Sequence, residues 1–206
     1  MFRRSFAPVA LAVLASAGCV PVSEPVGDID KAERDKALVG TWVTKSKGFA
    51  NFFGLNTLNV TLTVDAPDVK GNPKGLMFAG TEGSTSEMAF FTATVGKYTY
   101  VNVLDGDKTL PRLHKEGEYA KWLKEKKKWY YGVFRYTLDS DALTLDCGNF
   151  VTFTKLMDDA KFENDGRKDM PRYTTPAGWL DKYLAKSGPD KVFDGSNVVV
   201  LKREKK

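Results

Sequence analysis

The chain has 206 residues, of which 42% are hydrophobic, and a formal net charge of +5. This length and apolar content suffice to bury the core of one domain and exclude an intrinsically disordered chain. The charge excess is modest, and together with the export signal described next it argues against a nucleic-acid partner.

The N-terminus, MFRRSFAPVALAVLASAGC, has the layout of a secretory signal. Arg3 and Arg4 give it a positive start, and an uncharged, mostly apolar stretch follows over residues 6–17. This stretch is shorter than the roughly 20 residues that a membrane-spanning helix needs. We therefore expect an exported protein.

The sequence allows two alternative sites for cleavage of the signal peptide. Residues 15–17, Ala-Ser-Ala, fit ordinary signal peptidase, which would leave Cys19 free or paired with Cys147. Residues 16–19, Ser-Ala-Gly-Cys, resemble a bacterial lipobox with Ser16 in place of the usual leucine. We favour the lipobox, which makes 1–18 a signal peptide and Cys19 the lipid attachment site. Cys147 then has no disulfide partner.

The lipobox implies a location and a tether. Val20 follows the cysteine, where inner-membrane lipoproteins often carry Asp, so the resemblance implies the outer membrane, facing the periplasm. Residues 19–36 are predicted to be a lipidated tether. A single domain is expected over 37–206, with no internal repeat.

Strand signals dominate from residue 39 onward. Alternation of apolar and polar residues is strictest in TLNVTLTVD at 57–65, which indicates a half-buried strand. Further strands are predicted at 40–46, 76–82, 87–95, 97–104 and 197–203, with up to three in 131–153. Turns are predicted at Asp139–Asp141 and at Gly148–Asn149. Eight or nine hairpin-linked strands favour an up-and-down barrel or a sandwich.

Two helices interrupt the strands. Residues 118–128 are amphipathic and rich in lysine, which favours a solvated face; an anionic membrane surface is the alternative. Residues 176–186 form the second helix, with Thr175 as its cap and Gly188 after its end.

Catalytic signals are weak. His114 is the only histidine, and Cys147 has no neighbouring base in the sequence. The acidic loop at 105–108 lacks the later ligands of a calcium loop. We expect no enzyme, no metal and no cofactor.

Aromatic residues gather on two predicted strands and suggest a ligand site. Tyr98, Tyr100, Phe134 and Tyr136 would give apolar walls with polar tips, suited to an amphiphilic ligand. Plain filling of the core is the competing interpretation, because the interior of an eight-stranded barrel can be packed or can hold one small ligand.

The segment Val39-Gly40-Thr41-Trp42 on the first strand resembles the G-x-W opening of lipocalins and related calycin barrels. The resemblance implies an eight- or nine-stranded antiparallel meander barrel. It also implies that Gly40 relieves crowding, that Trp42 plugs the closed end and that a basic residue from the end of the last strand packs over the indole. Lys202 and Arg203 are the candidates, and we prefer Arg203. Unlike lipocalins, this chain places its second helix before the last strand. The chain is also similar to a loose group of uncharacterised bacterial lipoproteins, from which no activity follows.

Two functions remain open at this point. The first is an envelope-anchored protein that binds a small apolar or amphiphilic ligand in its barrel. The second is a structural or protein-interaction module of the envelope with a filled barrel. An enzyme is a distant third.

Overall fold

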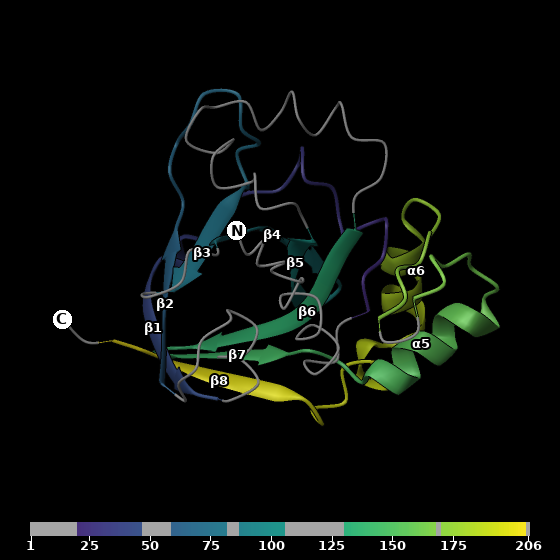
Figure 1. Cartoon of the computed structure of the whole chain (residues 1–206). Helices are drawn as coiled ribbons and strands as arrows, with labels where there is room; N and C mark the ends of the chain where they lie inside the picture. The colour runs from purple at the N-terminus through teal and green to yellow at the C-terminus, as the bar shows by residue number, and fades with distance from the viewer. Residues whose placement is uncertain (1–19, 47–58, 82–86, 106–129, 168–169, 205–206) are drawn as a thin grey trace, which may run out of the picture.

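The computed structural model describes residues 20–46, 59–81, 87–105, 130–167 and 170–204. Eight antiparallel strands form one closed barrel, in which each strand pairs with its neighbours in sequence and the last closes on the first (Figure 1). The strands are β1 (Gly40–Lys45), β2 (Asn59–Asp65), β3 (Met77–Thr81), β4 (Glu87–Val95), β5 (Tyr98–Asp105), β6 (Tyr130–Asp139), β7 (Ala142–Asp146) and β8 (Val198–Arg203). The helices are η1 (Lys36–Leu38), α5 (Phe150–Asp159), α6 (Trp179–Ser187) and η2 (Pro189–Lys191). The predicted mainly β meander barrel with two short helices is confirmed.

Strand alternation builds the core as the sequence predicts. In β2, Val60, Leu62 and Val64 are buried, whereas the alternate residues Asn59 and Thr63 are exposed. Burial of the apolar side chains on the inner face stabilises the barrel by about 25 cal/mol for each Å² of apolar surface removed from water. The same period of two sets which residues of every strand face inward.

Trp42 plugs one end of the barrel. Its side chain is fully buried, and its Nε1 donates to the Leu38 carbonyl at 2.8 Å. The Arg203 guanidinium lies 4.2 Å from the ring centroid and donates to the carbonyls of Val39 and Ala37. This is the contact predicted from the two ends of the barrel sequence.

Gly40 makes room for that guanidinium. A Cβ at this position would lie 2.8 Å from Nη1 of Arg203, and the backbone φ of +138° disfavours any other residue. The role expected for Gly40 is therefore present in the structure.

The segment after Cys147 corrects a prediction. The expected turn at Gly148–Asn149 and the strand after it are absent; the chain forms helix α5 instead. The Asn149 side chain accepts from the Thr152 N–H at 3.1 Å, so Asn149 is a helix cap and not a turn residue. Phe153 and Met157, four residues apart, bury one helix face.

Helix α6 lies close to its predicted position but begins later. Its N-cap is Gly178, in the left-handed conformation, and not Thr175. The Thr175 hydroxyl instead accepts from the Glu24 N–H at 3.2 Å, which ties it to the N-terminal segment. Gly188 follows the helix as predicted.

The expected tether is an integral part of the domain. Residues 20–35, here called the strap, lie on the outer wall of the barrel, and Val20, Val22 and Val26 are buried. Val22 forms β-bridges to Tyr131 of β6 and to Tyr173. A loose linker would leave these valines in water, so residues 20–35 pack as part of the barrel domain.

Asn102 fastens the middle of the strap. Its amide exchanges two hydrogen bonds with the backbone of Val26, at 2.8 and 2.9 Å, and it is fully buried. Further along the strap, Ile29 and Ala32 pack against the outer faces of β3 to β6. The strap thus spans several strands of the barrel wall.

The predicted lipid attachment site Cys19, the helix at 118–128 and His114 lie outside the described residues. Within the described part of the chain, no helix combines the length and the apolar character needed to cross a membrane.

Candidate functional site

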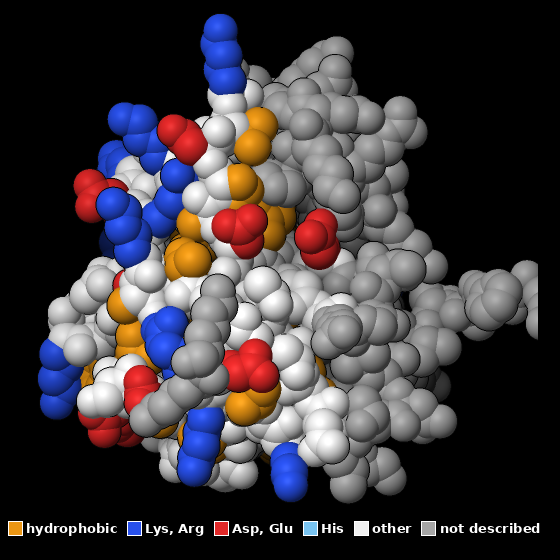
Figure 2. Space-filling view, turned by 90° about the vertical axis from the view of Figure 1, so that its left-hand side faces the viewer, with side chains coloured by type: hydrophobic (Ala, Val, Ile, Leu, Met, Phe, Trp, Pro, Cys, Tyr) orange, Lys and Arg blue, Asp and Glu red, His pale blue; other side chains and the backbone are white. Residues whose placement is uncertain are grey.

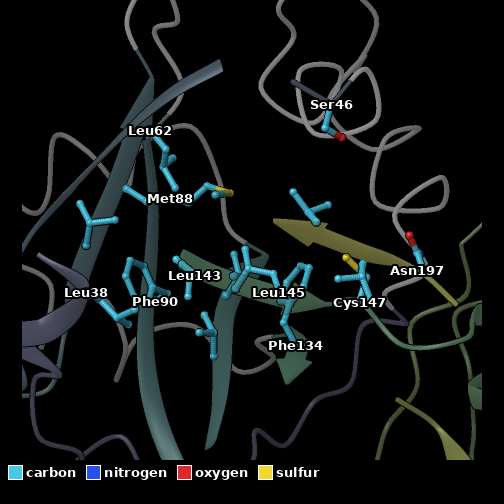
Figure 3. A pocket seen from close by; sticks show the side chains of 16 residues that line it. Leu38, Ser46, Leu62, Met88, Phe90, Phe134, Leu143, Leu145, Cys147 and Asn197 are labelled. Carbon is cyan, nitrogen blue, oxygen red and sulfur yellow. The ribbon is translucent and has the colours of Figure 1, made fainter. Parts of the chain in front are cut away.

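An apolar cavity of about 150 Å³ lies inside the barrel. Its walls come from β2 to β8, from η1 and from the residues next to β1, β7 and β8 (Figure 3). The apolar lining residues are Leu38, Leu62, Val64, Ala79, Met88, Phe90, Val101, Val103, Phe134, Leu143, Leu145, Val198 and Val199. No charged side chain is among the described residues that line it, so the cavity suits an uncharged, apolar group.

The polar groups of the lining gather at one end. Ser46 follows β1, Cys147 follows β7 and Asn197 precedes β8, and all three positions are at the end of the barrel remote from Trp42. Figure 3 shows Ser46 and Asn197 on one side of the cavity and Leu38 on the opposite side. The cavity therefore has an apolar end and a more polar end.

The cavity is narrow. It reaches from Leu38, at the plugged end, to Ser46, just beyond β1. Strand β1 has six residues, and at about 3.3 Å of rise per residue it is about 20 Å long. A volume of about 150 Å³ spread over such a length leaves room for a chain rather than for a wide ring system. Typical pockets for drug-sized ligands are larger, about 300–1,000 Å³.

Phe134 lines the cavity as predicted, and Tyr136 faces the same interior from the plugged end. The Tyr136 hydroxyl donates to Asp35 at 2.6 Å. Burial and this hydrogen bond raise the pKa of Tyr136 well above its usual value, so the phenol is neutral. Tyr136 belongs to the hydrogen bonding that closes the barrel and is not among the cavity-lining residues.

Tyr98 and Tyr100 lie on the opposite face of the wall from Phe134. Val101 pairs with Phe134, and both face inward, so the residues on either side of Val101 must face outward. Tyr100 is fully buried against Phe193, with ring centroids 5.6 Å apart. The structure thus divides the four aromatics between two sites.

An ion-pair cluster surrounds Tyr98 on the outside. The Arg135 guanidinium bonds to Asp146 at 3.0 Å and to Asp190 at 2.5 Å, and it lies 5.2 Å from the Tyr98 ring. The Tyr98 hydroxyl donates to Asp190 at 3.1 Å. The hydrogen bond from Arg135 lowers the pKa of the Asp190 carboxyl. This cluster attaches η2 to the barrel wall.

Sequence reasoning missed much of the lining. Leu143 and Leu145 occupy inward positions in a strand that the sequence does predict, so alternation could have found them. Ser46 and Asn197 lie outside regular alternation, and nothing local marks them. Cys147 is buried and forms no disulfide bond, and it lines the polar end.

Among the described residues no group of three or more His, Cys, Asp or Glu side chains could hold a metal ion. The fold and the site together define a closed antiparallel barrel with a narrow internal cavity. No protein-family model, curated protein or solved structure matches this chain.

Proposed function

We propose that this protein is an envelope-anchored lipoprotein whose barrel binds the unbranched apolar chain of an amphiphilic ligand. The observation that carries the proposal is the shape and polarity of the cavity: it is narrow and apolar, with its polar side chains at one end. An apolar cavity of about 150 Å³ stays dry and takes up small apolar molecules in other proteins. An alkyl chain lying along the barrel would fill such a space.

The resemblance to lipocalins supports the same proposal. Gly40, Trp42 and Arg203 have the geometry that the G-x-W pattern implies, with the guanidinium over the indole. A barrel plugged at one end by a large ring leaves the other end for ligand entry. Lipocalin-like ligand binding is therefore our preferred class.

The polar end can receive a head group. Thr81 does not line the cavity itself, but it is on the inward face of β3, one alternation step beyond the lining residue Ala79, and its buried hydroxyl has no hydrogen-bond partner among the described residues. A buried polar atom without a partner costs free energy, so a ligand hydroxyl or carboxyl that bonds to it would bind more tightly. Asn197 and Ser46 offer further polar atoms at this end.

The lipobox supports the anchor and its location. Lipidation at Cys19 would hold the protein at the outer membrane, facing the periplasm. Because Val20 is already buried in the domain, the barrel would lie directly at the membrane, with no free tether.

The alternative is a structural or interaction module with a filled barrel. The interior cavity favours ligand binding over this alternative, because a filled barrel would have side chains in that space.

A titration with dodecanoate tests the ligand class. Ala79→Leu adds a bulkier side chain to the cavity wall, and we expect it to weaken dodecanoate binding at least tenfold, since one filled methylene position is worth about 0.8 kcal/mol. Ala185→Leu on the exposed side of α6 is the matched control and should bind as the wild type does.

Adamantane-1-carboxylate carries the same carboxylate on a wide ring. The proposal predicts no measurable binding of this compound. Equal affinity for both compounds, or equal affinity of Ala79→Leu and Ala185→Leu for dodecanoate, would contradict it.

A further inference from the structure

The outer face of β7, β8 and β1 is partly apolar and basic. Outward positions on β8 are Val198, Val200 and Lys202, of which the two valines are 41% and 48% exposed. Val43 pairs with Lys202 across one seam, and Lys45 is the next outward residue of β1. We call these five residues the β8 face.

Two of the three large hydrophobic side chains that are exposed in the described part of the chain belong to this face. Exposed apolar side chains that gather on one surface mark an interaction site. A water-facing sheet would instead carry polar residues at these alternate positions.

The charged outward side chains within the β8 face are lysines, and acidic side chains lie around the face. Its charged outward residues on β8 and β1 are Lys45 and Lys202, both exposed. The one acidic residue at an outward position of β7, Asp146, is buried and paired with Arg135. Exposed carboxylates lie near the plugged end at Asp139, Asp141 and Glu204, and before the start of β8 at Asp194. Around β1 and β2, Figure 2 shows acidic, basic and hydrophobic side chains intermixed.

The backbone ladder that closes the barrel between β1 and β8 is short beside this face. β1 and β8 pair only through Trp42–Arg203 and Val43–Lys202, whereas β1 pairs with β2 along its whole length. Further from the plug, the Thr44 hydroxyl donates to the Val200 carbonyl at 2.7 Å in place of a backbone ladder. Val198 both lines the cavity and is exposed, so the cavity reaches the barrel surface here.

We propose that the β8 face docks on a lipid surface rich in anionic headgroups, and that the cavity takes its chain from that surface. The proposal rests on the proposed function for the identity of the ligand, but the docking itself does not. Lysines near an anionic membrane gain electrostatic energy, and valines between them can enter the interface. The short ladder between β1 and β8 would be the route from that interface to the cavity.

Vesicle flotation tests the docking. The exported chain carrying Cys19→Ala, which has no site for a lipid anchor, is mixed with phosphatidylcholine vesicles that contain or lack phosphatidylglycerol. We expect binding to the anionic vesicles only. The variant Lys45→Gln/Val200→Ser/Lys202→Gln should bind them at least tenfold more weakly, because each lysine near an anionic surface contributes about 1 kcal/mol.

A matched control makes the same three changes elsewhere. Val151→Ser/Lys155→Gln/Lys161→Gln alters exposed residues on and just after α5 and should bind vesicles as the parent does. Equal losses in both variants, or a parent chain that ignores anionic vesicles, would overturn the docking proposal and point to a protein partner for this face.

Dodecanoate titration of the same variants separates the two proposals. The β8-face variant changes no residue that lines the cavity, so it should bind dodecanoate as the parent does. The three changed residues are Lys45, Val200 and Lys202. Loss of vesicle binding with dodecanoate binding retained supports docking by this face. A parent chain that binds vesicles through the face but binds no dodecanoate would support the docking and contradict the proposed function.

Discussion

At the scale of single residues, the plug is the feature most fully determined by the sequence. Trp42 is buried by the barrel, and Arg203 covers its ring from the other end of the chain. The contact between Arg203 and the indole requires that position 40 carry no side chain, because a Cβ there would clash with the guanidinium, and glycine meets this requirement. These three residues could be predicted because a short pattern at one strand implies a partner on the strand that closes the barrel.

The plug gives a direct stability prediction. Trp42→Ala removes a fully buried indole, and we expect a loss of about 3–5 kcal/mol in the free energy of unfolding. Urea denaturation followed by far-ultraviolet circular dichroism measures it. Trp179→Ala, at a half-buried ring on α6, is the control and should cost less. A loss below about 1 kcal/mol for Trp42→Ala would contradict the plug.

The faces of the aromatic residues could not be fixed from the sequence. The two aromatic residues on β5, and likewise the two on β6, are two positions apart and therefore share a face of their strand. Which face of the barrel wall that is depends on how β5 pairs with β6. The register sets Val101 opposite Phe134, which sends Tyr100 outward and Phe134 inward. One residue of slip would reverse the faces, and nothing in the local sequence specifies this choice.

At the scale of elements, α5 and the strap show where local pattern fails. Phe150–Asp159 begins with phenylalanine, valine and threonine, residues that favour strands. Tertiary packing of Phe153 and Met157, with the Asn149 cap, makes it a helix. The strap has buried valines between prolines, and no periodicity distinguishes it from a linker.

The strap gives a second stability prediction. Asn102→Ala leaves the backbone N–H and carbonyl of Val26 buried without their partners, and we expect a loss of about 2–4 kcal/mol in the free energy of unfolding. Asn164→Ala removes a turn hydrogen bond to Gly166 and a side-chain interaction with Tyr173, leaves the strap's bonds to Asn102 intact, and is the control. If both substitutions cost the same small amount in urea denaturation, the strap would be a dispensable tether.

At the scale of the whole molecule, a mainly β barrel could be predicted from alternation and turn residues, since each strand carries its own inward face. The cavity could not, because its volume depends on how well side chains from all eight strands fill the interior. Ser46, Cys147 and Asn197 meet at one end only through barrel closure. The proposed anchor depends on the lipobox, a sequence signal that lies outside the described residues.

The anchor is tested in the cell envelope. Cys19→Ala removes the acceptor thiol for the lipid, so we expect the protein to move from the membrane fraction to the soluble periplasmic fraction. Immunoblots of the two fractions measure the change, with Cys147→Ala as the control that should stay in the membrane fraction. Identical fractionation of the two variants would refute lipidation.

The central claim is that the barrel carries a chain-like ligand. Native mass spectrometry of the exported Cys19→Ala protein, compared with its mass after denaturation, tests this most directly. The account predicts an added mass of one aliphatic amphiphile that leaves on denaturation and is reduced in Ala79→Leu. A native mass equal to that of the bare chain, with dodecanoate added in excess and still unbound, would contradict it.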